Sequence, residues 1–214
     1  MYRKIVKRFL DIILSGFGLI LLSPLFLIIS ITIKLDSKGP VFFKQKRIGI
    51  QKTQFYIIKF RTMHTNTPKD TPTHMLKDSE QHITRVGKIL RKTSLDELPQ
   101  IINIFIGQMS IIGPRPALWN QDDLIAEREK FGANDVLPGL TGWAQINGRD
   151  ELEIDVKAKL DGEYAEKIGF MMDIRCFFGT IFSVLRSDGV VEGGTGVKAK
   201  ASQTSNSKTE ETVK

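Results

Sequence analysis

The chain has 214 residues, with 31 lysines and arginines against 24 aspartates and glutamates, which gives a formal net charge of +7. This length allows one domain with a hydrophobic core plus appendages. The positive balance favours an anionic partner, and composition leaves three open: a nucleic acid, an acidic membrane surface or a phosphorylated substrate. The single cysteine, Cys176, excludes an internal disulfide framework, and the three histidines form no cluster with zinc-ligand spacing.

Residues 12–33 carry no charge over 22 positions, which is long enough for a helix to cross a bilayer. A cleaved signal peptide is the weaker interpretation, because the apolar run is long and no small-x-small cleavage site follows it. Two features argue against a straight span: Ser23-Pro24 at the midpoint, and basic residues on both flanks. Positive charge marks the cytoplasmic end of a span, so a straight helix would satisfy only one flank.

A re-entrant hairpin satisfies both flanks, and we expect it over residues 1–35. Proline disturbs a helix, and a break at Ser23-Pro24 leaves two arms of about ten residues, each roughly 15 Å long. Each arm reaches about halfway through a hydrocarbon core of roughly 30 Å, and both basic ends stay near anionic lipid at one surface. We expect the Ser23 hydroxyl to bond a carbonyl freed by the proline, and Asp11 to lie at the membrane interface beside basic residues.

The next segments read as short elements. β-rich runs at residues 41–43 and 55–58, separated by Gly49, predict a small β-hairpin. Residues 64–80 are polar with two prolines, which predicts a loop or lid. Apolar residues at helical spacing predict a helix over residues 83–92, and an apolar helix, or a helix plus a strand, follows an acidic pair.

A rigid turn and a glycine-rich loop follow. In the sequence GPRP, Pro114 and Pro116 fix the backbone on either side of Arg115, so the turn presents this side chain from a stiff support. Residues 137–149 form a loop punctuated by glycines, with polar side chains between them.

The last apolar segment, residues 170–186, is too interrupted by charges to span a bilayer. We interpret it as an amphipathic helix in the headgroup region, with a core helix as the alternative. Residues 191–214 have few large apolar side chains, which predicts a disordered tail. The fold class is therefore α/β, mostly α with a small β-hairpin: a re-entrant membrane segment, a compact cytoplasmic domain over residues 36–190, and interfacial helices.

The stretch KTSLDELPQ, residues 92–100, places two carboxylates side by side. One interpretation is structural. Ser94 and Glu97 fit a capping box, or Asp96 caps a helix in which Pro99 occupies an early position. In either case the acids lie at a helix N-terminus, where the helix dipole favours them.

The other interpretation is chemical. Arginine side chains match phosphate geometry well, and four basic residues are candidates for binding anionic oxygens: Arg91, Lys92, Arg115 and Arg149. Adjacent carboxylates are able to hold Mg²⁺ together with substrate phosphate oxygens, and an ionised aspartate is the nucleophile of aspartyl-phosphate chemistry. A basic site with a carboxylate pair beside a membrane segment suggests phosphoryl transfer at the bilayer surface.

Several longer motifs occur in one order along the chain: KRFLDIILS and the following SP, KFRTM, LRKTSLDELPQ, MSIIGPRP, PGLTGWAQINGR and LDGEY. On these motifs the chain resembles the bacterial sugar transferases, the small monotopic phosphoglycosyl transferases that load a first sugar phosphate onto polyprenyl phosphate. The resemblance runs from about residue 2 to residue 187. It is to the minimal catalytic-core form, without the family's additional membrane-spanning N-terminal domain, and makes residues 36–190 the catalytic domain.

The resemblance implies a two-step mechanism. Asp96 attacks the β-phosphate of a UDP-sugar, UMP leaves, and polyprenyl phosphate then takes the phosphosugar from the covalent aspartyl intermediate. Glu97 assists through metal binding or positioning, both acids are implied metal ligands, and Mg²⁺ or Mn²⁺ is the implied cofactor. The residues expected to bind phosphate or nucleotide, or to shape that site, are Lys59, Arg61, Arg91, Pro114, Arg115, Pro116, Gln145, Arg149 and Asp161.

The resemblance also implies partners and a location. The donor is expected to be the UDP derivative of an N-acetylated or modified hexose, and the acceptor polyprenyl (undecaprenyl) phosphate. Anionic phospholipid, downstream glycosyltransferases and other copies of the chain are further expected partners, and nucleic acid is not. The expected place is the cytoplasmic face of the bacterial inner membrane, at the first membrane step of exopolysaccharide, capsule, O-antigen or other glycoconjugate synthesis.

One departure from the family pattern affects the choice of sugar. Many members have tryptophans between the NGR and LDxxY elements, whereas this segment reads DELEIDVKAKLDGEY.

Two other functions would give different sequence patterns. A membrane-anchored nucleic-acid binder predicts aromatic residues interleaved with lysine and arginine, but the aromatics here lie in apolar runs. A non-catalytic adaptor of a polysaccharide-assembly complex would not need the carboxylate pair.

Overall fold

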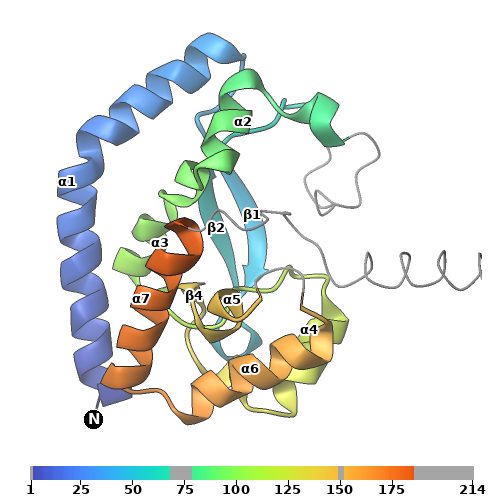
Figure 1. The fold of residues 1–214 in the computed structure, drawn as a ribbon. Coiled ribbons are helices and arrows are strands. Elements are labelled where there is room, and N and C mark those ends of the chain that lie inside the picture. The colour runs from blue at the N-terminus through green and yellow to red at the C-terminus, as the bar shows by residue number, and fades with distance from the viewer. Residues whose placement is uncertain (1, 68–78, 149–151, 186–214) are drawn as a thin grey trace, which may run out of the picture.

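The structure is a computed structural model that describes the chain apart from residues 1, 68–78, 149–151 and 186–214. The described part is mostly helical, with two small two-stranded sheets (Figure 1). This confirms the mostly helical fold with a small β element. The predicted disordered tail and most of the predicted loop over residues 64–80 lie outside the described residues.

The apolar N-terminal segment forms α1 (Lys7–Asp36), one helix of 30 residues that is long and apolar enough to cross a membrane. It is continuous rather than two arms separated by a break, but its axis changes direction partway along (Figure 1). Pro24 lies inside it and cannot donate to the carbonyl of Ile20. The Ser23 hydroxyl donates to this carbonyl at 2.8 Å, which confirms the expected compensation.

The first half of α1 is held by a polar stripe. Lys7, Asp11 and Ser15 are buried and recur every four residues, so they share one face of the helix. The Asp11 carboxylate accepts the backbone N–H of Ile111 at 2.9 Å, and the Lys7 ammonium donates to Asp173 at 2.6 Å. Asp11 is therefore buried against the folded domain, and its expected position at a membrane interface stays a prediction.

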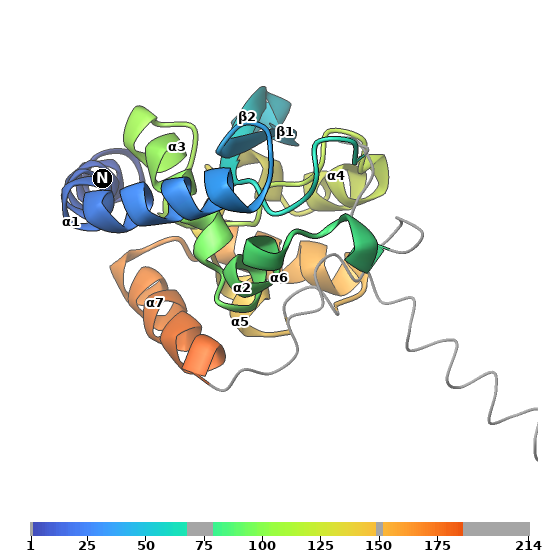
Figure 2. The ribbon, with the colours of Figure 1, turned by 90° about the horizontal axis from the view of Figure 1, so that it is seen from above.

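The second half of α1 is held by apolar packing. Ile29 and Ile33 are buried in one cluster with Phe60 and Leu90. Figure 2, which looks down on the molecule, shows α3 and α7 on different sides of the first half of α1, and the second half running toward β1 and β2. Both halves of the apolar helix therefore contact the same folded domain.

The first sheet is the predicted hairpin. Strands β1 (Phe42–Ile48) and β2 (Gln54–Phe60) pair antiparallel, with Phe43 opposite Lys59. The second sheet pairs β3 (Ser110–Ile112) with β4 (Gly139–Thr141) in parallel, across a long crossover. Together the two sheets support the segments that carry the acidic pair and the GPRP turn.

Six further helices complete the described fold. They are α2 (Arg85–Lys92), α3 (Gln100–Ile106), α4 (Asp122–Glu129), α5 (Trp143–Ile146), α6 (Ile154–Glu166) and α7 (Phe170–Leu185). Helix α2 is the helix predicted over residues 83–92, and the Thr84 side chain caps it by accepting the N–H of Gly87 at 2.9 Å. Helix α7 buries Met172 and Cys176 but exposes phenylalanines along its other side. One side of α7 therefore packs in the core, and the interfacial position of its exposed side stays a prediction.

Candidate active site

The acidic pair follows a sharp change of backbone direction. Helix α2 ends at Lys92, Ser94 adopts a left-handed conformation with φ of 56°, and Leu95–Glu97 make one 3₁₀ turn before α3 begins at Gln100. No side chain caps either the turn or α3. Both capping interpretations are therefore wrong, and the carboxylates of Asp96 and Glu97 project from a turn between two helices.

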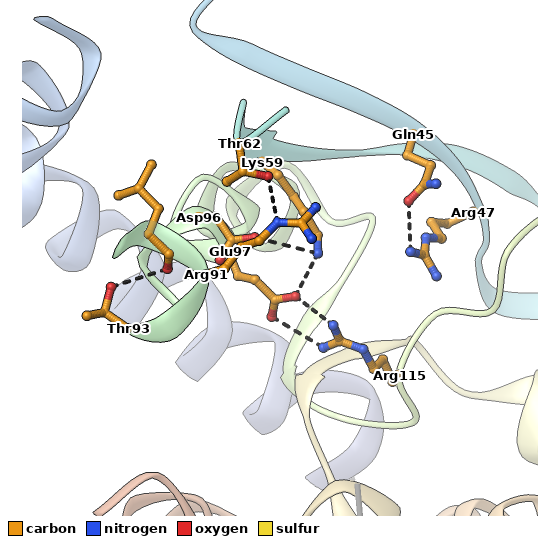
Figure 3. A network of polar contacts seen from close by, with 10 residues as sticks. Gln45, Arg47, Lys59, Thr62, Arg91, Thr93, Asp96, Glu97 and Arg115 are labelled. Carbon is orange, nitrogen blue, oxygen red and sulfur yellow. Dashed lines mark hydrogen bonds and ion pairs between the residues drawn. The ribbon is translucent and has the colours of Figure 1, made fainter. Parts of the chain in front are cut away.

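Glu97 is held by two cations. Its Oε1 lies 2.8 Å from the Lys59 ammonium and 2.6 Å from the Arg115 guanidinium, which also reaches Oε2 at 3.3 Å (Figure 3). Burial alone would raise the pKa of the Glu97 carboxyl, but Arg115 and Lys59 together hold this pKa well below its usual range. Glu97 is therefore an ionised carboxylate over the whole neutral range.

Asp96 lies beside this clamp. Its side chain is 5% exposed, and its Oδ2 is 4.0 Å from the same Lys59 ammonium. Arg91, from the last turn of α2, belongs to the network drawn in Figure 3 and donates from Nε to the Thr62 hydroxyl at 2.9 Å. Lys59 thus lies between the two carboxylates, contacts Glu97 closely and leaves a longer gap to Asp96.

The GPRP turn is held by several backbone hydrogen bonds. Gly113 donates to the carbonyl of Thr141 at 2.8 Å, and the carbonyl of Pro114 accepts the N–H of Gly139 at 2.9 Å. The carbonyl of Pro116 accepts from the Arg47 guanidinium at 3.0 Å. Because the prolines also fix φ, the turn offers the Arg115 side chain from an immobile support, as the sequence predicted.

The carbonyl of Arg115 is held by a residue that the sequence analysis missed. Arg128 of α4 donates to the carbonyl of Arg115 at 2.9 Å, and to the Asp161 carboxylate at 2.8 and 2.5 Å. Burial raises the pKa of the Asp161 carboxyl, and the charge of Arg128 opposes this. The available sequence signal was the spacing: Arg128 follows the apolar Leu124 by one helical turn and so shares its face of the helix. The structure buries both residues.

The other predicted binding residues are dispersed. The Arg61 guanidinium donates to the carbonyls of Ser37, Lys38 and Pro40 at 2.9 Å or less, so it fixes the chain after α1 rather than facing the acidic pair. The amide atoms of Gln145 are buried without a hydrogen-bond partner among the described residues. Arg149 lies outside the described residues, so its predicted role stays a prediction.

The carboxylates of this site fit Mg²⁺ only together with oxygen ligands from a substrate. No group of three or more histidine, cysteine, aspartate or glutamate side chains gathers within the described part of the chain. One or two carboxylates with phosphate oxygens and water suffice for Mg²⁺ in phosphoryl-transfer sites. Asp96 and Glu97 fit that pattern, and phosphate oxygens would also balance the positive charge of Lys59 and Arg115.

The site thus combines two buried acids, basic side chains beside them and a domain that carries an apolar helix long enough to cross a membrane. A sequence model described as "Bacterial sugar transferase" matches residues 2–187. The chain therefore belongs to the bacterial sugar transferase family, and it is an enzyme of the transferase class.

Curated relatives agree with this family. The "Uncharacterized sugar transferase EpsL" of Bacillus subtilis (strain 168) is 38% identical over 186 residues, which cover 87% of this chain and 90% of that protein. The "UDP-glucose:undecaprenyl-phosphate glucose-1-phosphate transferase" of Escherichia coli (strain K12) is 38% identical over 84% of this chain and 40% of that protein. The "UDP-N-acetylgalactosamine-undecaprenyl-phosphate N-acetylgalactosaminephosphotransferase" of Aeromonas hydrophila is 36% identical over 86% of this chain and 44% of that protein. The chain thus spans less than half of the last two relatives.

Proposed function

We propose that this protein transfers a sugar 1-phosphate from a UDP-sugar to undecaprenyl phosphate and releases UMP, through a covalent intermediate on Asp96. The sugar is an N-acetylated or otherwise modified hexose. The observation that carries the proposal is the arrangement at the acidic pair: Lys59 and Arg115 both contact Glu97, and Asp96 lies 4.0 Å from Lys59 at the edge of this clamp. Two relatives whose names give sugar phosphate transfer to undecaprenyl phosphate support it.

The first step joins the enzyme to the sugar phosphate. A carboxylate oxygen of Asp96 attacks the phosphorus that bears the sugar, the bond from this phosphorus to the UMP oxygen breaks, and UMP leaves with the bonding electrons. The product is an acyl phosphate on Asp96. Lys59 and Arg115 reduce the repulsion between the aspartate and the diphosphate and stabilise the charge on the transferred group.

The second step regenerates the enzyme. An oxygen of undecaprenyl phosphate attacks the same phosphorus, and the Asp96 carboxylate leaves with its electrons, which gives undecaprenyl diphosphate sugar. Asp96 and Glu97 would hold Mg²⁺, or Mn²⁺, together with phosphate oxygens, and the ion would neutralise further negative charge. Glu97, ionised and fixed by two cations, positions Lys59 and Arg115 in both steps.

We further propose that α1 is re-entrant and that the protein is monotopic on the cytoplasmic face of the inner membrane. The contacts of both ends of α1 support this. Lys7 bonds Asp173 of α7, and the Asp36 carboxylate near the other end accepts the N–H of Val86 in α2 at 3.1 Å. A straight span would separate these ends by a bilayer of about 30 Å, whereas both contact one domain.

Helix α7 supplies the expected interfacial surface. Its exposed side carries phenylalanines at positions 170, 177, 178 and 182, and the start of the helix lies beside the N-terminal end of α1 (Figure 1). An amphipathic helix of this kind rests in the headgroup region of a bilayer. This surface would keep the active site at the depth where the phosphate of undecaprenyl phosphate lies, at the first membrane step of a surface polysaccharide or glycoconjugate.

Intact-protein mass spectrometry tests the covalent mechanism. The detergent-solubilised protein is incubated with Mg²⁺ and a panel of UDP-sugars, without undecaprenyl phosphate. We expect a mass increase of one phosphosugar with one donor, its absence in Asp96→Asn, and its loss when undecaprenyl phosphate is added. UMP release that requires undecaprenyl phosphate, without an adduct, would contradict the covalent step. Unchanged turnover of Asp96→Asn would contradict the assignment of the nucleophile.

A single introduced cysteine tests the topology. Ile5 is exposed, so we expect Ile5→Cys to react with a membrane-impermeant maleimide in inside-out vesicles and not in intact spheroplasts. Burial, reinforced by Asp173, raises the pKa of the Cys176 thiol to about 12, so the native cysteine stays protonated and unlabelled. Labelling of Ile5→Cys in intact spheroplasts would contradict the re-entrant helix.

A further inference from the structure

Arg128 connects three parts of the fold from a buried position. Its side chain is 5% exposed. Its Nε and one terminal nitrogen donate to Asp161 of α6, and the same terminal nitrogen donates to the carbonyl of Arg115. The guanidinium therefore joins α4, α6 and the GPRP turn. Its hydrogen bonds within the described residues go to Asp161 and Arg115, not to Asp96 or Glu97.

Helix α6 anchors the turn at two points. Asp161 and Tyr164 are both 1% exposed and three residues apart, so they share one face of the helix. Asp161 acts through Arg128 on the carbonyl of Arg115, and the Tyr164 hydroxyl lies 3.0 Å from the carbonyl oxygen of Ile112, just before the turn. Between them, a Cβ on Gly162 would come within 2.3 Å of Phe131, so α6 packs closely on the segment after α4.

We infer that Arg128, held by Asp161, is a positioning residue for sugar phosphate transfer, because it fixes the backbone from which Arg115 reaches Glu97 and the phosphate of the donor. This inference rests on the proposed function. It gives the LDGEY segment a role: Asp161 orients Arg128 rather than binding substrate, and Tyr164 secures the other end of the same turn.

The size of the effect follows from the geometry. The prolines have a fixed φ, Pro116 restricts the residue before it, and the Arg115 carbonyl is held, so the backbone that carries the Arg115 side chain has little freedom. A catalytic group displaced by about 1 Å loses about a hundredfold in rate. Release of one carbonyl is a smaller disturbance when the carbonyls of Pro114 and Pro116 remain bonded, so we expect a loss of kcat/KM between about tenfold and a hundredfold.

The test uses variants that keep the interior electrically balanced. Removal of one partner of a buried ion pair is strongly destabilising, whereas replacement of both partners by apolar residues of similar volume is often neutral. We would therefore use Arg128→Met/Asp161→Leu, together with Arg128→Lys, which keeps the charge but not the forked geometry. Each change is made in the unaltered protein and in an Arg115→Lys background. Arg8→Met is the matched control, because Arg8 also donates to backbone carbonyls, but at the end of α3.

Two measurements decide the matter. The first is kcat/KM for UMP release; the second is hydrogen exchange of the turn amides, which needs no activity. If Arg128 acts through Arg115, its variants lose tenfold or more in the unaltered protein but less than about twofold in the Arg115→Lys background. They also increase the exchange of the amides of Gly113, Arg115 and Ala117, whereas Arg8→Met changes kcat/KM by the same factor in both backgrounds and leaves that exchange unaltered.

The opposite results separate the two proposals. Equal losses in both backgrounds, or an unchanged exchange rate in the turn, would overturn the positioning role alone. If the unaltered protein released UMP from none of the UDP-sugars, the proposed function would be contradicted. The inference rests on that function and would then be contradicted too.

Discussion

The buried pair between Lys7 and Asp173 yields a quantitative prediction. The two atoms are 2.6 Å apart, and the side chains are only 8% and 12% exposed. Lys7→Met leaves Asp173 buried without its cation, a change that typically costs about 3–5 kcal/mol. The Tyr2 hydroxyl at 2.8 Å and the Tyr164 hydroxyl at 2.7 Å still donate to Asp173, so we expect the lower end, about 3 kcal/mol.

The assay is thermal unfolding in detergent. For a domain of this size, 1 kcal/mol shifts Tm by about 2–4 °C, so Lys7→Met should lower Tm by roughly 6–12 °C. Lys167→Met is the matched control, because the Lys167–Glu163 pair has a similar distance of 2.9 Å but side chains that are 60% and 37% exposed. An exposed pair contributes about 0–1 kcal/mol. A second variant, Lys7→Met/Asp173→Asn, should recover most of the loss, because the neutral amide needs no cation and can accept from one tyrosine hydroxyl while it donates to the other. Equal shifts for Lys7→Met and Lys167→Met would refute the reasoning.

Three further predictions concern single side chains. Ser23→Ala should lower the free energy of unfolding by about 1 kcal/mol, because it removes the hydrogen bond to the Ile20 carbonyl. In a Pro24→Ala background the restored backbone N–H bonds that carbonyl, so the same change should cost nothing. Equal losses in thermal unfolding of the two backgrounds would contradict this. Arg61→Met should lower Tm but leave the KM for the donor unchanged, because its three hydrogen bonds go to backbone; a raised KM at unaltered Tm would restore a phosphate-binding role. The pKa of Glu97 is lower in the folded protein than its ordinary value of 4.5, so ionisation of Glu97 stabilises the fold above pH 4.5, and this stability is lost as the pH falls further. The difference in free energy of unfolding between the unaltered protein and Glu97→Gln, measured by urea unfolding, should therefore become smaller below that pH. A difference independent of pH would contradict the two-cation clamp on Glu97.

Local patterns predicted the local structure. The β-rich runs around Gly49 became β1 and β2, and the helical spacing before the acidic pair became α2. The Ser-Pro step gave the compensating hydrogen bond to Ile20. In each case the residues that decide the structure lie within a few positions of one another, so the sequence order itself carries the information.

Long-range contacts were not predictable in the same way. The partner of Asp11 is the backbone N–H of Ile111, far along the chain, and no residue near Asp11 in sequence indicates this contact. A capping box fits Ser94 and Glu97 in sequence, yet the left-handed backbone at Ser94 turns the carboxylates toward Lys59 and Arg115 instead. A basic residue in a motif looks the same in sequence whether it contacts a carboxylate of the site, as Arg115 does, or backbone carbonyls, as Arg61 does.

The attachment of α1 has a consequence for how the protein is made. Lys7 leaves the ribosome 166 residues before Asp173, and Asp11 leaves it 100 residues before Ile111. Domains tend to fold as units during synthesis, from the N-terminal side, but the polar stripe of α1 has no partners until later segments exist. Its contact with Asp173 forms only after α7 has been synthesised, so α1 is the first α-helix to be made and one of the last to complete its packing.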